Sequence, residues 1–409
     1  MNKFLKEFKD RGFFYQCTNE DDLSKLLDKE KINGYIGFDC TAESLHVGSL
    51  LQIMCLRLLQ KHGHRPIVLL GGGTTRIGDP SGKDKTRTIL SEEEIEKNIK
   101  NIEKILKNFL DIKDAKTKPI FVNNYSWLKN LNYISFLRDI GKHFTINKML
   151  SFDSVKTRLE REQSLSYMEF NYMILQAYDF LKLSKKENCV LQMGGSDQWG
   201  NIVNGVDLIK RHSNKQAYGL TTPLITLASG AKMGKTESGA VWLDKKFLLP
   251  YDYWQFWRNI DDRDVLKFLK IFTDLSVEEI EKIKSQNINE QKIILANEAT
   301  SMLYGEKEAK ASEQTAKKTF SENSLGSGLP SILLNKKQLD NKINIIDLII
   351  LSKLETSKSE IRRLIKGKGI KINNNIVNDE KLFITKELFE DNFIKLSLGK
   401  KRHVKVNLS

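Results

Sequence analysis

The sequence predicts an α/β protein in which a parallel-sheet domain is followed by an α-helical domain and a small α+β domain. Three observations support this order. Short apolar runs alternate with helical patterns in the first half, strand signals fade after Leu248, and a Ser- and Gly-rich stretch at 321–331 precedes a basic tail. We therefore place the domains at 1–247, 248–320 and 341–409, with 321–340 as a linker.

The parallel sheet follows from the order of elements near the N-terminus. The runs "GYIGFD" (34–39), "RPIVLLGG" (65–72) and "KPIFVNN" (118–124) are typical of buried strands. The helical run "LLQIMCLRLLQKHG" (50–63) separates the first two. A strand, a crossover helix and a second strand in this order predict parallel pairing.

The second domain is expected to be helical. The runs "YDYWQFWRNI" (251–260), "DDRDVLKFLKIF" (261–272) and "SVEEIEKIKS" (276–285) have helical patterns. Ser276 and Glu279 have the spacing of a capping box, which marks the start of the last helix.

Composition excludes several classes of protein. The 409 residues are 40% hydrophobic and 29% charged, which is ordinary for a globular chain of two or three domains. No apolar run reaches the roughly 18 residues of a membrane helix, and "MNKFLKEFKDRGFF" is neither a signal nor a transit peptide. The four cysteines lack C-x-x-C spacing, which argues against zinc and disulfides. We expect a cytoplasmic protein with no membrane segment and no resident metal ion.

The stretch "YIGFDCTAESLHVGSL" (35–50) has the features of an anion site at the start of a helix. Gly37 and Gly48 flank the turn and would let a ligand approach the backbone. His46 falls in the first helical turn, where free N–H groups and the helix dipole favour a phosphate. The ordinary alternative is a histidine that only completes the helix end.

Two common nucleotide-binding motifs are excluded by "GGGTTRIGDPSGK" (71–83). Arg76 stands where the third glycine of G-x-G-x-x-G belongs, and Asp79 stands where a P-loop requires lysine. The chain is therefore not predicted to be a dehydrogenase or a P-loop kinase.

Several motifs in order carry a resemblance to a known family. "HVGS" (46–49) resembles the H-I-G-H signature of class I aminoacyl-tRNA synthetases, and "KMGKT" (232–236) resembles their mobile K-M-S-K-S loop. With "GFDCTAESLHVG", "GDPSGK", "LQAYDF" and "GGSDQWGN" in the same order, nearly the whole chain resembles bacterial-type tyrosyl-tRNA synthetases. The resemblance implies a Rossmann-like catalytic domain, an anticodon-arm-binding helical domain and an RNA-binding tail.

Two positions depart from the signatures. Ser49 occupies the place of the second histidine, so one imidazole normally directed at ATP is replaced by a hydroxyl. Gly234 replaces the central serine of the second signature, while Lys232, Lys235 and Thr236 remain.

The run "YMEFNYMILQAYDFLKL" predicts an apolar helix with Tyr172, Gln176 and Asp179 on one face. A buried carboxylate needs a donor, and the phenol of a bound tyrosine is one. The resemblance implies that Tyr35 and Asp179 bind the substrate hydroxyl, and that Tyr172 and Gln176 bind its α-amino group. Phenylalanine would leave the carboxylate unpaired. The alternative is that Asp179 pairs with an arginine or caps a neighbouring element.

The string "LQMGGSDQWGN" follows an apolar strand, and alone it would be read as a Gly-rich turn with a polar cap. The resemblance implies that Gln192 and Gln198 contact tyrosine and the adenylate, that Asp79 binds the α-ammonium, and that Asn124 lies on the substrate side. It also implies an ATP- and adenylate-binding set of Gly37, Asp39, His46, Gly48, Ser49, Gly195, Asp197 and Lys235, in which Gly195 and Asp197 bind the ribose.

The implied reaction needs no general base, because the carboxylate of free tyrosine is already ionised. It attacks the α-phosphate of ATP, and the terminal hydroxyl of tRNA later attacks the tyrosyl-adenylate. We assign Thr41 and His46 to the phosphates, Lys232 and Lys235 to pyrophosphate, and count Thr236 with the loop's catalytic groups. Mg²⁺ is expected with ATP as co-substrate, not in a protein cage.

The basic tail predicts a polyanion partner. The formal net charge is +14, and residues 341–409 carry 15 Lys and Arg against 8 Asp and Glu. A helix with a capping box of Ser357 and Glu360, ended by Gly367, would place Lys358, Arg362, Arg363 and Lys366 toward solvent, opposite Ile361, Leu364 and Ile365.

A hairpin is expected around Asn373 to Asn375. The segment resembles a small RNA-binding module shared with a ribosomal protein and pseudouridine synthases. A solvated surface helix is the alternative.

The resemblance also implies a homodimer through "FLRDIGKHFTINKML" (136–150) and tRNA(Tyr), L-tyrosine and ATP as partners. Two rival functions remain at this point. One is a tryptophanyl-tRNA synthetase, which shares the fold and both signatures but needs no second phenol partner. The other is a non-catalytic RNA-binding protein derived from a synthetase, which Ser49 would suit.

Overall fold

The computed structural model describes residues 2–79, 90–230, 233–236, 239–321, 329–335, 338–339, 342–389, 393–399 and 402–408. Contacts divide the chain into two compact units. The first consists of Met1–Lys235, Val241–Asp244 and Asp261–Gln291; the second consists of Thr236–Ala240, Lys245–Ile260 and Lys292–Ser409.

The first unit is built on a six-stranded sheet in the order β1-β6-β5-β2-β3-β4. The strands are β1 (Gln16–Cys17), β2 (Asn33–Phe38), β3 (Arg65–Leu70), β4 (Ile120–Asn123), β5 (Cys189–Gly195) and β6 (Tyr218–Thr222). All neighbours pair in parallel except β1, which is antiparallel to β6. The predicted parallel sheet is confirmed, including all three strands expected near the N-terminus.

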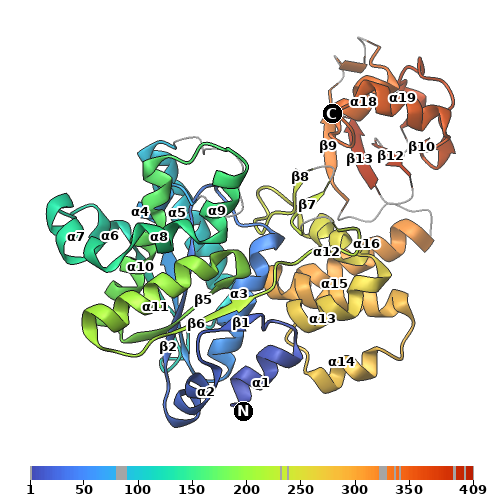
Figure 1. Ribbon diagram of the computed structural model, residues 1–409. Coiled ribbons are helices and arrows are strands. Elements are labelled where there is room, and N and C mark those ends of the chain that lie inside the picture. The colour runs from blue at the N-terminus through green and yellow to red at the C-terminus, as the bar shows by residue number, and fades with distance from the viewer. Residues whose placement is uncertain are drawn as a thin grey trace. The chain divides into compact units, whose positions relative to one another are not determined.

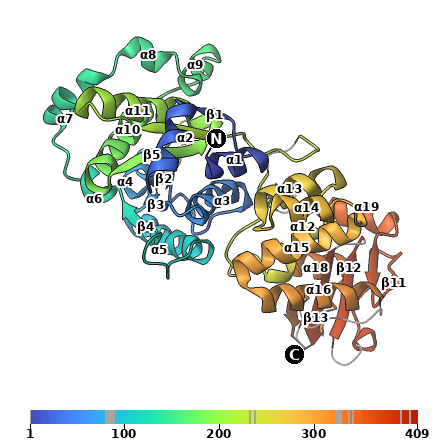
Figure 2. The same ribbon diagram turned by 90° about the horizontal axis from the view of Figure 1, so that it is seen from below.

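Helices cover both faces of this sheet, as Figures 1 and 2 show. The long helices α10 (Tyr167–Glu187) and α11 (Trp199–Ser213) lie side by side on one face, and α3 (Val47–Lys61) and α5 (Glu92–Phe109) lie on the other. A core of fully buried side chains, including Ile67, Phe180 and Leu208, fills the space under α10 and α11. Burial of both faces explains why these strands are continuous apolar runs.

The remaining helices of this unit are short. They are α1 (Lys3–Asp10), α2 (Glu20–Lys29), α4 (Gly72–Thr75), α6 (Tyr125–Leu128), α7 (Tyr133–Asp139), α8 (Ile146–Leu150), α9 (Asp153–Glu160), α13 (Val265–Phe272) and α14 (Val277–Ile283), with 3-10 turns η1 (Gly141–His143), η2 (Ser196–Gln198) and η3 (Asp262–Asp264). Both halves of the predicted capping box of Ser276 and Glu279 are present at α14.

The segment containing α13 and α14 clusters with the sheet unit, although we drew a domain boundary at 247/248. The guanidinium of Arg11 donates to the carbonyls of Lys270, Thr273 and Leu275, at 2.7–3.0 Å, and Arg57 pairs with Asp274. These bonds from α1 and α3 hold the segment against the sheet domain. The functional assignment of 248–320 to the anticodon arm stays a prediction.

The second unit contains the helices α12 (Pro250–Arg258) and α16 (Glu306–Ser321) and the part of α15 (Ile288–Tyr304) that begins at Lys292. It also contains the short β7–β8 pair (Lys235–Thr236 and Gly239–Ala240), except for Lys235, which belongs to the first unit. Trp254 on α12 donates its indole N–H to Asn297 on α15 at 2.8 Å, and Asn297 donates to Glu313 on α16 at 2.7 Å. This chain of bonds ties the three helices together. Half of the predicted linker, 321–340, lies outside the described residues.

The C-terminal part of this unit is a five-stranded sheet in the order β11-β10-β12-β13-β9. Its elements are β9 (Ser331–Leu334), α18 (Ile345–Leu351), α19 (Lys358–Lys366), β10 (Ile370–Ile372), β11 (Asn375–Ile376), η4 (Lys386–Leu388), β12 (Phe393–Leu398) and β13 (Arg402–Leu408). The predicted hairpin is confirmed: Asn373 and Asn374 have φ of +47° and +69°, as a tight turn between β10 and β11 requires.

The predicted capping box at α19 is only half formed. The Ser357 hydroxyl accepts from the N–H of Glu360, but the N–H of Ser357 donates to Glu355 at 3.1 Å. The Glu360 carboxylate instead pairs with Arg363 one turn along the helix. The box is incomplete because another carboxylate already satisfies the N–H of Ser357. Gly367 ends the helix as predicted.

Candidate active site

A cavity of about 570 Å³ lies at the carboxyl edge of the parallel sheet. Between β2 and β5 the strand order reverses, with β3 and β4 on one side and β6 on the other. Ligands of open α/β sheets bind at such a point. Most predicted site residues line this cavity: Tyr35, Gly37, Asp39, His46, Gly48, Ser49, Asp79, Tyr172, Gln176, Asp179, Gln192, Gly195, Asp197 and Gln198.

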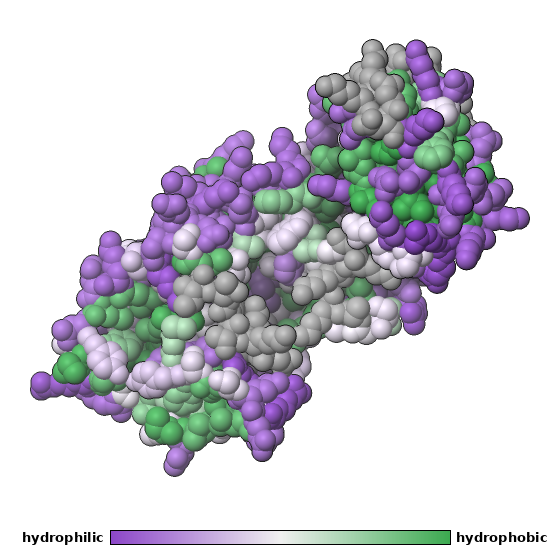
Figure 3. Space-filling view, turned by 90° about the horizontal axis from the view of Figure 1, so that it is seen from above, coloured by the Kyte–Doolittle hydropathy of each residue, from purple (hydrophilic) through white to green (hydrophobic). Residues whose placement is uncertain are grey.

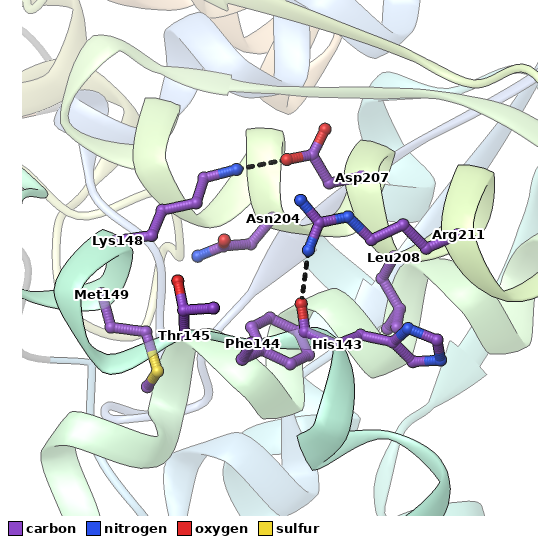
Figure 4. A pocket seen from close by; sticks show the side chains of 9 residues that line it. All are labelled: His143, Phe144, Thr145, Lys148, Met149, Asn204, Asp207, Leu208 and Arg211. Carbon is purple, nitrogen blue, oxygen red and sulfur yellow. Dashed lines mark hydrogen bonds and ion pairs between the residues drawn. The ribbon is translucent and has the colours of Figure 1, made fainter.

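A second cavity lies between η1–α8 and α11 (Figure 4) and has a volume of about 10 Å³. That is about the space of one water molecule. Its charged side chains are engaged by nearby groups: Lys148 pairs with Asp207, and Arg211 donates to the carbonyl of His143 at 2.7 Å. None of the predicted site residues lines it, so the larger cavity is the candidate active site.

Asp179 forms the deep end of that cavity. It is 1% exposed, and it accepts hydrogen bonds from the amide of Asn124 at 2.8 Å and from the indole N–H of Trp127 at 2.7 Å. Burial raises the pKa of Asp179 to about 7, although both hydrogen bonds act to lower it. Within the described ranges no lysine or arginine pairs with it, so the protein supplies only neutral donors to this carboxyl group.

Tyr35 on β2 and Gln192 on β5 are register partners across the switch point. Both side chains are buried and both line the cavity. The Tyr35 hydroxyl and the Gln192 amide oxygen have no hydrogen-bond partner among the described residues. Burial and the nearby Asp179 raise the pKa of Tyr35 well above its ordinary value. A ligand with a polar atom at this point would satisfy buried groups that are expensive to leave unpaired.

A second polar group lies nearer the mouth. Asp39 accepts from the hydroxyl of Thr74 at 2.9 Å and from the hydroxyl of Tyr172 at 3.1 Å. Asp79 accepts from the amide of Gln198 at 2.9 Å. Burial, and then the charges of Asp39 and Asp79, raise the pKa of Tyr172 well above its usual range. Together with Asp179, these carboxyl groups make the cavity attractive to a cation such as an ammonium group.

His46 is the N-cap of α3, one residue before the first helical turn in which we expected it. Its Nδ1 accepts from the N–H of Gly48 at 3.0 Å. In the neutral imidazole the proton therefore resides on Nε2. The capping role that we gave as the alternative is present, and His46 lines the cavity as well.

The two glycines of the first motif differ in how closely the protein packs against them: Gly37 is tightly packed, and only Gly48 leaves no room for a Cβ. A Cβ at Gly37 would lie 3.2 Å from the Leu69 side chain. A Cβ at Gly48 would lie 2.6 Å from the imidazole of His46 and 2.9 Å from the carbonyl of Met233. Both residues also line the cavity.

Five of the residues predicted for catalysis or substrate binding are not among those that line the cavity. Asn124 is fully buried behind Asp179, where it also accepts from the N–H of Gly73 at 2.7 Å. Thr41 is exposed and is not part of the lining. Lys232 lies outside the described residues, and for Lys235 and Thr236 the structure describes only the backbone, in β7.

Sequence reasoning missed Trp127 and Thr74, which position Asp179 and Asp39. Both follow the carboxyl ends of parallel strands, Thr74 after β3 and Trp127 after β4. That position is a usable signal, since side chains at that edge of the sheet meet at the cavity.

Two features are absent from the described residues. They contain no group of three or more His, Cys, Asp or Glu side chains that could hold a metal ion. No helix among them is long and apolar enough to cross a membrane.

Comparison with known proteins identifies the family. The family model described as "tRNA synthetases class I (W and Y)" matches residues 27–321. The family model described as "Tyrosine--tRNA ligase SYY-like C-terminal domain" matches residues 322–406. The chain is 82% identical over 408 residues to a tyrosine–tRNA ligase of Pelagibacter ubique (strain HTCC1062), covering 100% of both chains. It is 55% identical over 413 residues to one of Wolbachia sp. subsp. Brugia malayi (strain TRS), covering 100% of this chain and 99% of that one.

A solved structure agrees with the sequence relatives. The C-terminally truncated mitochondrial tyrosyl-tRNA synthetase of Aspergillus nidulans is 30% identical, with a TM-score of 0.69, over 78% of this chain and 94% of that one. The predicted fold class and the resemblance are confirmed. The chain therefore belongs to the tyrosine–tRNA ligase family of class I aminoacyl-tRNA synthetases.

Proposed function

We propose that this enzyme, a tyrosine–tRNA ligase by family, selects its amino acid with Tyr35 and Asp179 and activates it in the 570 Å³ cavity. It joins L-tyrosine to ATP as tyrosyl-adenylate, releases pyrophosphate, and transfers the tyrosyl group to the terminal adenosine of tRNA(Tyr). The observation that carries the choice of amino acid is the buried carboxyl group at the deep end, held only by neutral donors.

Tyrosine would enter with its phenol toward Asp179. The O–H of the substrate phenol donates to the Asp179 carboxylate, and the hydroxyl of Tyr35 donates to the oxygen of that phenol. Phenylalanine supplies no such group, so the buried Tyr35 hydroxyl would stay without a partner and Asp179 would keep only its two neutral donors. The α-ammonium would then lie among Asp79, Tyr172 and Gln176, with Gln192 and Gln198 contacting the rest of the substrate.

The adenylation step relies on positioning and charge. The tyrosine carboxylate attacks the α-phosphorus of ATP, a new C–O–P bond forms, and the bond to the β-phosphate oxygen breaks. We assign the Nε2–H of His46 to a phosphate oxygen, because its Nδ1 is engaged by Gly48. Thr41, Lys232, Lys235 and Thr236 keep the roles predicted for them on the phosphates.

ATP would be held across the mouth of the cavity. Gly37, Asp39, Gly48 and Ser49 line the cavity, as do Gly195 and Asp197, the proposed ribose pair. Mg²⁺ binds readily through substrate phosphates with its remaining waters, so we place it with the nucleotide.

The basic face of α19 is proposed to hold tRNA. Lys358, Arg362 and Arg363 are half or more exposed, and their pairs with Asp347, Glu380 and Glu360 are surface pairs that contribute little free energy. Phosphates can displace such partners. Lys366 is exposed on the same helix, while Ile361 and Ile365 are buried in the core of the small domain.

We also propose a homodimer through the surface formed by α7, α8, α9 and the start of α10. This surface, hereafter the α7–α10 patch, exposes large apolar side chains, which Figure 3 shows at the left among polar ones. They are Tyr133, Ile134, Leu137, Ile146, Leu150, Leu159, Tyr167 and Met168. Such a patch on a globular surface marks an interaction site. As a translation enzyme it would work in the cytoplasm.

Amino-acid-dependent exchange of labelled pyrophosphate into ATP tests the proposal. We expect exchange with tyrosine and none with tryptophan or phenylalanine. Exchange with tryptophan would make the protein the sister synthetase, and no exchange with any amino acid would favour a non-catalytic RNA-binding protein. In Asp179→Ala, near-normal exchange with tyrosine would remove Asp179 from the pocket.

A further inference from the structure

Backbone hydrogen bonds join the two signature segments beside His46. The N–H of Val47 donates to the carbonyl of Val241 at 2.9 Å, and Leu243 donates to Leu45 at 2.8 Å. Val241 in turn donates to the carbonyl of Gly234 at 3.2 Å. Main-chain hydrogen bonds therefore connect the second signature, through Val241, to the N-terminus of α3.

Gly234 is the point at which this backbone meets the imidazole. It is buried, and its φ of +109° is a conformation that side-chain-bearing residues rarely adopt. A Cβ at this position would lie 2.7 Å from Nδ1 and 3.2 Å from Cε1 of His46, and 3.0 Å from the N–H nitrogen of Gly48. Carbon and nitrogen atoms in ordinary contact are farther apart than 2.7 Å, so only a glycine fits here without displacing the ring.

The ring of His46 is thus bounded on several sides. Gly48 donates to Nδ1, Gly234 lies against the same edge, and the ring of Trp242 meets it edge-on, with centroids 6.2 Å apart. These contacts fix both the direction of the ring and the nitrogen that carries the proton.

We propose that Gly234 is a positioning residue, which acts by letting the second signature lie directly on His46 and hold its Nε2–H toward the cavity. The inference rests on the proposed role of His46 at the phosphates. It also gives the departure from the K-M-S-K-S pattern a reason, because a serine at position 234 would carry a Cβ into the imidazole.

The chain offers a matched control for the substitution. Gly239 has a φ of +117°, close to that of Gly234, but a Cβ there would meet no described atom within 4 Å. Alanine at either position introduces similar backbone strain, and only alanine at 234 contacts His46. The difference between the two variants therefore isolates the contact.

The experiment compares Gly234→Ala, Gly234→Ser and Gly239→Ala in the full-length enzyme by single-turnover adenylate formation and by equilibrium tyrosine binding. We expect adenylate formation to fall roughly tenfold or more in both position-234 variants relative to Gly239→Ala, as for a catalytic group displaced by about 1 Å. The Kd for tyrosine should be unchanged in all three. Equal rates in Gly234→Ala and Gly239→Ala would overturn the inference.

A double-mutant cycle with His46→Ala separates this inference from the proposed role of His46. If Gly234 acts through the ring, Gly234→Ala should cause no additional loss, beyond that of Gly239→Ala, once the imidazole is gone. The same loss in both backgrounds would make Gly234 a merely structural residue. A His46→Ala enzyme with the wild-type rate would instead refute the role of His46.

A spectroscopic readout is independent of activity. The chain has six histidines, so ¹⁵N-histidine labelling with His46→Ala as the assignment variant can identify the His46 nitrogens. We expect the Nε2–H tautomer in the wild type and in Gly239→Ala, and a mixture in Gly234→Ala. A single unchanged tautomer in Gly234→Ala would contradict the proposal.

Discussion

The indole N–H of Trp127 donates to one oxygen of Asp179, opposite the oxygen that Asn124 engages. Burial raises the pKa of this carboxyl group to about 7, and the two donors limit that rise. They therefore keep a useful fraction of Asp179 ionised at neutral pH while leaving it in place for a ligand.

Trp127→Phe is expected to weaken tyrosine binding by roughly tenfold, since a hydrogen bond to a charged group contributes about 1.5–3 kcal/mol. The ring remains, so packing is largely conserved. Equilibrium binding at pH 7.5 and thermal unfolding measure the two effects separately. An unchanged Kd would show that Trp127 does not position Asp179.

Tyrosine affinity should depend on pH through Asp179. The phenol donates to the ionised carboxylate, so affinity is complete above the pKa of about 7 and falls as pH decreases through it, by up to about tenfold per pH unit. Asp179→Asn should bind tyrosine weakly at every pH from about 5.5 to about 8, a range chosen because it spans the pKa of about 7. A wild-type Kd that is flat over this range would contradict the assignment.

Lys235→Ala should slow adenylate formation far more than it weakens tyrosine binding, because its charge is assigned to the departing pyrophosphate. Pre-steady-state kinetics and equilibrium binding give the two values. Lys245→Ala, at an exposed lysine further along the chain, is the control and should change neither. Equal losses in rate and affinity for Lys235→Ala would show the assignment to be wrong.

Deleting residues 341–409 should spare pyrophosphate exchange and cripple tRNA charging, since the basic face of α19 is assigned to the tRNA. A variant with alanine at Lys358, Arg362, Arg363 and Lys366 keeps the small domain folded, because these side chains are exposed and the apolar face of α19 is untouched. It should also reduce the salt dependence of tRNA binding. Normal charging by both variants would refute the role of the tail.

Ile134→Glu should dissociate the proposed homodimer, because it places a charge within the α7–α10 patch. Leu333→Glu is a matched control, since both side chains are 70% exposed and Leu333 lies on β9. Sedimentation equilibrium measures the change. A wild-type enzyme that sediments as a monomer, or a dimer unaffected by Ile134→Glu, would contradict the predicted interface.

The family resemblance supplied most of the predicted site residues, and local periodicity placed three of them on one helix face. Tyr172, Gln176 and Asp179 share a helix face at regular spacing, and all three line the cavity as expected. The strands that carry Tyr35 and Gln192 are buried on both sides, and such apolar runs are readable without a structure.

What could not be predicted depends on contacts between distant segments. Trp127 reaches Asp179 from a different strand end, and nothing in the residues around Trp127 indicates a carboxylate partner. Glu355 accepts the hydrogen bond from the N–H of Ser357 that was expected for Glu360. Both carboxylates lie near the start of α19, and the local sequence does not determine which of them accepts this bond. In the sequence, Gly234 is only a departure from a signature. The lack of space for a Cβ at this position becomes visible only in the structure, where Gly234 lies beside His46.

The pairing of β2 with β5 has a consequence for biosynthesis. Tyr35 and Gln192 are adjacent in the sheet, yet the ribosome makes Tyr35 long before Gln192, and the intervening chain contains β3, β4 and several helices. A nascent chain released before Cys189 would carry Tyr35 and Asp179 but would lack β5, and with it Gln192 and the wall that this strand provides. Free tyrosine should therefore stabilise only chains that have emerged past Gly195, and protease resistance of stalled fragments would rise abruptly at that length.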